Sequence, residues 1–356
     1  MKVGLVLGAG GIQGGAWLTG GLDALAAETG WDPTEADYVV GTSAGSMMGA
    51  LCASGVPPWF MVAHSRGEVF EGVVGVDGRP AAEADRAGGA RFELQRALPP
   101  IGPGSWRLAF RTLANPRRYT PATVFTGWIP RGIFTTEPLK ETIRRVVPGG
   151  WSPHPNLWVV ACDYETGRRV PFGRAGAPEA ELADAIAASC AIPGIYHPQT
   201  IGGRRYVDGG IYSTSNLDLL RDEDLDLAIC LNPTSTLHPV RAAFSPREWL
   251  NLAMRNASGR RLGSEAKKLS PGGTEVVLIQ PTGEDLEAMG PNLMSARRRN
   301  QVIEVARRTV ASQLAEPRNR ELLADLPPGD PRKIHRPEGP PSGWPDWREL
   351  LPQPAM

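Results

Sequence analysis

A serine flanked by small residues lies between a short apolar run and a run suited to a helix. Residues 41–45 read Gly-Thr-Ser-Ala-Gly and follow the apolar residues 38–40. The pattern G-x-S-x-G at the junction of a strand and a helix is typical of a strained turn that projects a serine hydroxyl away from the backbone. Gly41 and Gly45 leave room for the neighbouring elements, and a helix N-terminus favours negative charge beside Ser43. We therefore predict that Ser43 is a nucleophile.

A glycine-rich loop follows the first apolar run of the chain. It contains Gly8, Gly10, Gly11 and Gly14. Without side chains in the way, the backbone amides of such a loop can converge on one point and bind an anion. The strand before this loop and the strand before the serine are expected to be neighbours. We therefore predict an oxyanion hole built from the amides around Gly10 and Gly11.

The same loop admits a second interpretation, a dinucleotide-binding fingerprint. Gly8, Gly10 and Gly14 fit a loose G-x-G-x-x-x-G pattern. That fingerprint also needs an acidic residue at the end of the second strand, where it binds the ribose hydroxyls. Here the second strand ends in Val40 and Gly41, so the sequence favours the oxyanion hole.

A serine hydroxyl needs a base, and the best candidate is Asp208. It follows the short strand expected at 205–207 and precedes Gly209 and Gly210. A carboxylate at the end of a strand, followed by two glycines, can stand at the same sheet edge as Ser43 with little steric cover. Asp-Gly-Gly alone is most often a turn, so this assignment depends on the serine.

The histidines supply a competing assignment, a Ser-Asp-His triad. Ser43, Asp208 and His238 occur in the order of an α/β-hydrolase triad. That fold places several strands before its nucleophile, whereas only about forty residues precede Ser43 here. We therefore expect Asp208 to act on Ser43 directly. Structural or solvated roles are expected for the histidines, which are His64, His154, His197, His238 and His335.

Strands and helices must alternate along the chain to position these residues. Strands are expected at 2–7, 38–40, 157–162, 169–172, 205–207, 225–231 and 275–279. Helices are expected after each of the first two strands, the first ending near Gly30, and at 137–147, 180–189, 246–268 and 295–314. The alternation predicts a mainly parallel sheet covered by helices.

Residues 55–135 interrupt this alternation and are expected to form an irregular insertion. The stretch is rich in Gly, Pro and Arg, and no acidic residue occurs between Glu93 and Glu137. In one interpretation its arginines pair with acidic residues elsewhere in the fold. In the other, arginines interleaved with aromatic residues form a lid or docking surface for an amphiphilic, anionic substrate.

Composition argues against several classes of protein. Acidic and basic residues balance at 38 each, so the chain lacks the bulk positive charge of a nucleic-acid-binding protein. No apolar run approaches the ~20 residues that a bilayer span requires, and no secretion signal is recognised. We therefore expect a cytoplasmic protein with peripheral contact to anionic membranes. Small buried thiols are expected for the four widely spaced cysteines, Cys52, Cys162, Cys190 and Cys230.

Together, these motifs resemble the patatin-like phospholipases. The resemblance is carried by the glycine-rich loop, by G-x-S-x-G within the first fifty residues and by the distant Asp-Gly-Gly. Residues 188–196 (Ala-Ser-Cys-Ala-Ile-Pro-Gly-Ile-Tyr) add to it, and it covers residues 2–54 and 135–232. The family usually has arginine or lysine where this chain has Gln13, which bears on how firmly the loop is held and how well a phosphate is bound.

The resemblance implies a three-layer α/β/α fold with a mainly parallel central sheet. We expect one acyl hydrolase domain, residues 1–315, that includes the insertion. A proline-rich tail, residues 316–356, holds ten prolines and is expected to be disordered or an extended strap.

The resemblance also implies a chemistry. Ser43 and Asp208 would form a dyad, with oxyanion donors at Gly10 and Gly11, that hydrolyses acyl esters of lipids through an acyl-enzyme without metal or cofactor. Activity of the phospholipase A or lysophospholipase type is expected. An acyltransferase or thioesterase that uses the same serine, and a non-catalytic lipid-binding relative, remain alternatives.

Overall fold

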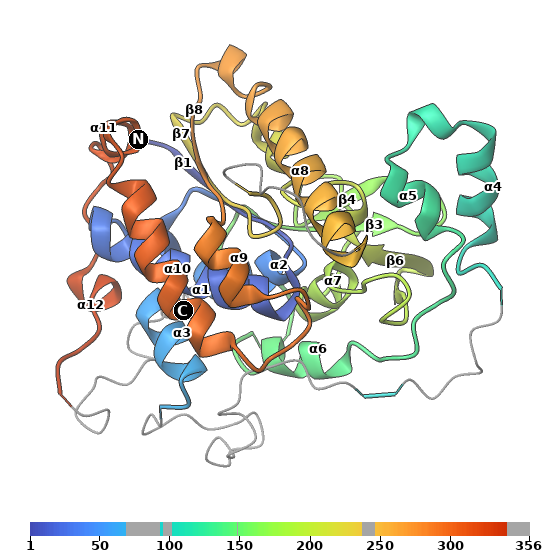
Figure 1. Ribbon diagram of the computed structural model, residues 1–356, viewed down its shortest axis with the longest axis horizontal. Coiled ribbons are helices and arrows are strands. Elements are labelled where there is room, and N and C mark those ends of the chain that lie inside the picture. Colours follow the sequence, from blue (N-terminus) through green and yellow to red (C-terminus); the bar gives the residue numbers. More distant parts are fainter. Residues whose placement is uncertain (69–92, 95–101, 148, 237–245, 340–356) are drawn as a thin grey trace.

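The central feature of the molecule is an eight-stranded sheet that lies between helices (Figure 1). The structure is a computed structural model that describes residues 1–68, 93–94, 102–147, 149–236 and 246–339. The strands are β1 (Val3–Leu7), β2 (Tyr38–Thr42), β3 (Leu157–Asp163), β4 (Arg169–Phe172), β5 (Gln199–Ile201), β6 (Arg204–Asp208), β7 (Leu227–Leu231) and β8 (Glu275–Ile279).

The strand order is β5-β6-β3-β2-β1-β7-β8, with β4 paired to β3. The five strands from β3 to β8 along this order are parallel to one another, while β4 and β6 run antiparallel to β3. The sheet is therefore mainly parallel, with an antiparallel edge, and the α/β/α class expected from the sequence is confirmed.

The sheet is covered on both faces because its central strands are apolar on both sides. Along β1, Leu5 and Leu7 pack into one core cluster, while Val6 packs into another. This follows from the alternation of side chains along a strand, and a continuous apolar run such as 3–7 is typical of a parallel strand buried on both faces.

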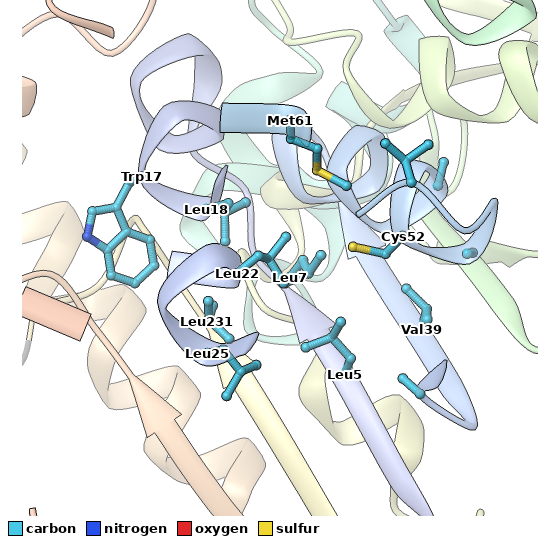
Figure 2. Packing of buried hydrophobic residues seen from close by; sticks show 14 of the residues in the cluster. Leu5, Leu7, Trp17, Leu18, Leu22, Leu25, Val39, Cys52, Met61 and Leu231 are labelled. Atoms are coloured by element: carbon cyan, nitrogen blue, oxygen red, sulfur yellow. The ribbon is translucent and has the colours of Figure 1, made fainter. Parts of the chain in front are cut away.

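Helices in the described part of the chain are α1 (Gly11–Thr29), α2 (Ala44–Ala53), α3 (Pro58–Ser65), α4 (Trp106–Ala114), α5 (Pro121–Thr126), α6 (Glu137–Arg144), α7 (Leu182–Ser189), α8 (Pro246–Ala266), α9 (Gly283–Met289), α10 (Arg299–Leu314), α11 (Pro317–Leu323) and α12 (Pro331–Ile334). Figure 2 shows Leu18, Leu22 and Leu25 of α1 beside Leu5 and Leu7 of β1. Helices α2, α3, α7 and α10 contribute to the same cluster, and α8 covers the opposite face through Leu262.

The expected elements are present, with ends that shift by a few residues. Helix α1 ends at Gly30 as expected, because that glycine adopts the left-handed conformation with φ 67° and its N–H bonds to the carbonyl of Ala26. Helix α6 ends at Arg144, three residues before the expected end. All four cysteines are buried and unbridged, as expected.

Two segments differ from the sequence-based expectation. The insertion is more regular than expected where it is described, since it contains α3, α4 and α5. The tail is neither disordered nor extended over its first part, because α11 and α12 form there. Trp59 Nε1 donates to the carbonyl of Arg332 (2.9 Å), and Lys333 lies 3.3 Å from the buried carboxylate of Asp32. These contacts fasten the tail to the N-terminal half of the chain, an effect of long-range contacts that local composition does not reveal.

Among the described residues, no helix combines the length and apolar character needed to cross a bilayer.

Candidate active site

Ser43 occupies a strained turn between β2 and α2. Its φ and ψ are 54° and −121°, a region that residues with a side chain rarely adopt. The turn is held by Ser46, whose N–H (2.8 Å) and hydroxyl (2.6 Å) both donate to the carbonyl of Ser43. These bonds therefore hold Ser43 in its strained conformation.

The glycines on either side of Ser43 are required by close backbone approach. A Cβ on Gly41 would lie 2.5 Å from Cα of Ser46. A Cβ on Gly45 would lie 2.0 Å from the carbonyl oxygen of Leu7, at the end of β1. Helix α2 therefore starts in direct contact with the neighbouring strand, and the sequence reason given for Gly41 and Gly45 agrees with the structure.

Ser189, at the end of α7, braces the turn from the other side. The N–H of Ser43 donates to Oγ of Ser189 (2.8 Å), and that hydroxyl donates to the carbonyl of Val160 in β3 (2.6 Å). Ser189 is fully buried, so no water competes for these bonds. A single hydroxyl thus ties the serine turn to the central sheet.

Asp208 ends β6, two strands away from β2. Strand β3 lies between them, with Val160 opposite Thr42 and Ala161 opposite Asp208. The Asp208 N–H donates to the carbonyl of Ala191 (3.0 Å), which follows α7. The register therefore places the ends of β2 and β6 at the same edge of the sheet.

The side chains of Ser43 and Asp208 meet at this edge. Both residues are buried, with 3% and 5% of their surface exposed, and the Ser43 hydroxyl lies close enough to the Asp208 carboxyl to lower its pKa. Burial is the larger effect and raises the pKa of Asp208 from 3.8 to about 6, while the Ser43 hydroxyl and the hydrogen bond from the Gly210 N–H (2.7 Å) limit that rise. A carboxylate with such a pKa can still accept a proton at neutral pH.

Cys190 is the third reactive side chain at this point. Its sulfur lies 3.9 Å from Oγ of Ser46, and the Ser43 hydroxyl is close enough to lower the pKa of the thiol. Burial, assisted by the nearby Asp208 carboxylate, outweighs these effects and raises the pKa of the thiol to about 12. The thiol therefore stays protonated and is a poor nucleophile.

The glycine-rich loop lies beside Asp208. A Cβ on Gly210 would lie 3.0 Å from Oδ1 of Asp208 and 3.5 Å from Cβ of Ala9, so the Asp-Gly-Gly turn touches the loop. The steric demand on the loop is severe at two positions. A Cβ on Gly10 would lie 2.6 Å from Cα of Gly14, and Gly11 has a φ of 62°.

The loop has free amides where the sequence predicts oxyanion donors. The N–H of Gly8 is taken by Leu231 (2.9 Å) and that of Ala9 by Thr214 (2.8 Å). Within the described residues, no acceptor takes the N–H of Gly10 or Gly11, which open the first turn of α1. The first N–H groups of a helix have no partner within the helix, so they are available to an anion.

Gln13 anchors this loop in place of the basic residue that the family usually has. Its side-chain Nε2 donates to the carbonyl of Ser295 and its N–H to that of Leu293 (2.9 Å). The side chain is fully buried, and its Oε1 has no hydrogen-bond partner among the described residues. The amide thus fastens the start of α1 to the segment before α10 without a charge.

Two positioning residues were not identified from the sequence as such. Ser189 belongs to the run 188–196, but its spacing gives no sign that it bonds to Ser43. Asn216 is buried with φ 55°, and its Nδ2 donates to Oγ1 of Thr42 (3.0 Å) and to the carbonyl of Ser213 (2.7 Å). The bonds from Ser189 to Ser43 and from Asn216 to Thr42 each join segments more than a hundred residues apart, so only the folded chain reveals them.

No described histidine is hydrogen-bonded to Ser43 or Asp208. His154 lies 2.6 Å from the carbonyl of Ala36, and His197 lies beside the carbonyl of Pro198. His238, the triad candidate, lies outside the described residues. The described residues also contain no group of three or more His, Cys, Asp or Glu that could hold a metal ion.

The arrangement joins the parts needed for nucleophilic acyl transfer. It holds a hydroxyl on a strained turn, a buried carboxylate beside it, and free backbone N–H groups nearby. A hydroxyl with an adjacent base can attack a carbonyl carbon, and backbone donors can stabilise the oxyanion that results.

Comparison with known proteins matches the chain to one family. The sequence profile of the family described as "Patatin-like phospholipase" matches residues 5–221, more than half of the chain. Relatives include an uncharacterized NTE family protein of Mycobacterium bovis and two of Mycobacterium tuberculosis, each 33% identical over 144 residues. The aligned part covers 39% of this chain and 38% of each relative.

Proposed function

The chain belongs to the patatin-like phospholipase family, and from this premise we propose that it is a lipid acyl hydrolase that uses Ser43 and Asp208 as its catalytic dyad. The observation that carries the proposal is the position of the Ser43 hydroxyl beside the buried Asp208 carboxyl, whose pKa the hydroxyl lowers. A serine attacks an ester only when a base can take its proton, and Asp208 is the base placed beside Ser43.

In the first half of the reaction, Ser43 is acylated. Its Oγ attacks the ester carbonyl carbon while its proton passes to Asp208. The N–H groups of Gly10 and Gly11 donate to the oxyanion of the tetrahedral intermediate. When the intermediate collapses, the bond to the alcohol breaks and the proton on Asp208 passes to the leaving oxygen, so that Asp208 is ionised again.

In the second half, water replaces the alcohol. Asp208 accepts a proton from the water as its oxygen attacks the acyl carbon, and the same amides stabilise the second oxyanion. Collapse returns the proton to Oγ of Ser43 and releases the fatty acid. One carboxylate therefore serves as base and acid in both halves, which suits a pKa near neutrality better than that of an exposed aspartate.

We propose that the substrates are phospholipids or lysophospholipids, so that the activity is of the phospholipase A or lysophospholipase type. The test is to incubate the protein with phosphatidylcholine and with lysophosphatidylcholine and to measure the fatty acid released. Ser43→Ala should release none. The matched control is Ser54→Ala, because the Ser54 hydroxyl is buried without a hydrogen-bond partner in the described structure.

Product analysis separates hydrolysis from transfer. With added alcohol or thiol acceptors, a hydrolase should still yield free fatty acid as its main product. Main products that are new esters or thioesters would indicate an acyltransferase instead. Vesicle binding without any product, from a protein whose Ser43 does not react with acylating probes, would indicate a non-catalytic lipid-binding relative and contradict the proposal.

A further inference from the structure

The α4–α5 hairpin, residues 105–129, has an apolar outer face that is open to solvent. Trp106, Phe110 and Leu113 recur along α4 at spacings of four and three residues, so they form one stripe on the helix. More than half of the surface of each is exposed, and Phe125 of α5 is 66% exposed. An exposed apolar patch of large side chains is typical of an interaction site.

The stripe faces outward because the opposite side of the hairpin is fixed to the core. Leu108 is fully buried and packs in a cluster with Val207 and Ile211, on either side of Asp208. The hydroxyls of Thr120 (2.7 Å) and Thr123 (3.2 Å) both donate to the carbonyl of Ile211. The hairpin is therefore attached next to the candidate base, and the outer stripe cannot turn inward without breaking these contacts.

The outer face is an ordered aromatic surface. The ring centroids of Trp106 and Phe110 are 5.7 Å apart, and Trp128 lies 6.4 Å and 6.5 Å from these two rings. Figure 1 shows α4 and α5 side by side, at the end of the molecule away from α10, α11 and α12. Because the rings already contact one another, little side-chain entropy remains to be lost on binding.

Cations surround this surface. Arg107, Arg111, Arg117 and Arg118 are exposed on the hairpin. Of these four arginines, only Arg107 has a described carboxylate within 4 Å, that of Glu165 at 3.8 Å. The interpretation that these arginines pair with acidic residues elsewhere is thus wrong for Arg111, Arg117 and Arg118.

We propose that the outer face of the α4–α5 hairpin is the docking surface of this protein for an anionic lipid bilayer. Tryptophan and phenylalanine settle at the boundary between headgroups and acyl chains, and arginine pairs with lipid phosphate. The aromatic side chains of the hairpin match the boundary between headgroups and acyl chains, and the arginines around them match the layer of lipid phosphates. Docking through this face would place Asp208 and Ser43, one layer below the hairpin, close to the lipids. The proposal concerns binding, so its test does not depend on hydrolysis.

The test measures vesicle binding in a Ser43→Ala background, where the lipid is not consumed. Sedimentation is compared for vesicles of phosphatidylcholine alone and of phosphatidylcholine with equal phosphatidylglycerol. We expect binding to the anionic vesicles that weakens as salt increases. Arg117→Gln with Arg118→Gln should weaken it about twenty-five-fold, from about fivefold for each arginine near an anionic surface. Trp106→Ala with Phe110→Ala should weaken it about tenfold or more.

Matched controls lie on other parts of the surface. Arg318→Gln with Arg320→Gln removes the same charge from α11, and Met254→Ser removes an exposed apolar side chain from α8. Both should bind like the parent. Binding that is unchanged in the hairpin variants, or lost equally in the controls, would overturn the proposal. So would a dimer that dissociates on Trp106→Ala with Phe110→Ala, since the occupant would then be a second copy of the chain.

Discussion

The backbone N–H of Ser43 is bound by the hydroxyl of Ser189 at 2.8 Å, across 146 residues of sequence. The same hydroxyl donates to the carbonyl of Val160 at 2.6 Å. The strained serine turn therefore does not hold itself in place. Ser189, on helix α7, holds the turn in place. A strained conformation at a functional site persists only when the surrounding structure fixes it in this way.

Ser189→Ala should impair both stability and turnover. It leaves a buried N–H and a buried carbonyl without partners, which costs about 1 to 3 kcal/mol in the free energy of unfolding. The turn should relax, and kcat for a short-chain ester should fall on the order of tenfold because the nucleophile is misplaced. Urea unfolding and ester hydrolysis measure the two effects.

Ser54→Ala is the matched control for that variant. Ser54 is also buried, with 5% of its surface exposed, but its hydroxyl has no hydrogen-bond partner in the described structure. Its loss should leave stability and kcat unchanged. If the two alanine variants behaved alike, Ser189 would have no positioning role.

The parallel centre of the fold was predictable because its signals are local. The apolar runs at β1, β3, β7 and β8 give the strands directly, and Gly8 stops the first of them. The junctions at Gly8–Gly14 and Gly41–Gly45 are likewise fixed by close backbone approach, which only glycine permits. These junctions are the parts of the site that the sequence located most firmly.

Long-range contacts account for what the sequence did not predict. Helices α3 and α5 lie in a segment with weak periodicity, and α4 carries apolar side chains on two sides, one packed against the core and the other exposed. The tail helix α12 depends on Trp59 and Asp32, which lie about three hundred residues earlier. The bond from Ser189 to Ser43 likewise joins distant segments, and neither partner shows it in its local sequence.

The pH dependence of hydrolysis should report the ionisation of Asp208. The carboxylate acts as a base only when it is ionised, and burial raises its pKa to about 6. We expect kcat/KM for a neutral ester to fall about tenfold per pH unit well below that pKa and to reach a plateau above about pH 7. A profile that stays flat down to pH 4 would show that a different base acts.

Asp208→Asn should stabilise the protein at alkaline pH. Because the pKa of Asp208 is raised on folding, from 3.8 to about 6, the native state binds the proton more tightly than the unfolded chain. Wild-type stability therefore falls as the pH rises through that window, by up to about 3 kcal/mol. Asparagine does not ionise, so the variant should be about 2 kcal/mol more stable than wild type at pH 8, with no such gain below pH 4. Urea unfolding at the two pH values measures the difference, and a gain of equal size at both would contradict the assignment.

Gly10→Ala should disable the loop that carries the proposed oxyanion donors. The new Cβ would lie 2.6 Å from Cα of Gly14, so the backbone of the loop must shift. Loss of one oxyanion donor costs kcat on the order of a hundredfold or more in serine enzymes.

Gly263→Ala is the control, since nothing lies within 4 Å of its Cβ position in α8. It should keep full activity and gain up to about 1 kcal/mol in stability. Normal turnover by Gly10→Ala would exclude the loop from catalysis.

The most direct test of the dyad is covalent labelling with a fluorophosphonate, followed by mass spectrometry of the peptides. Wild type should carry one adduct, on Ser43. Ser43→Ala should carry none, and Asp208→Asn should react on the order of a hundredfold more slowly or not at all, because the hydroxyl has lost its base. An adduct on another residue, or an Asp208→Asn variant that reacts at the wild-type rate, would contradict the account.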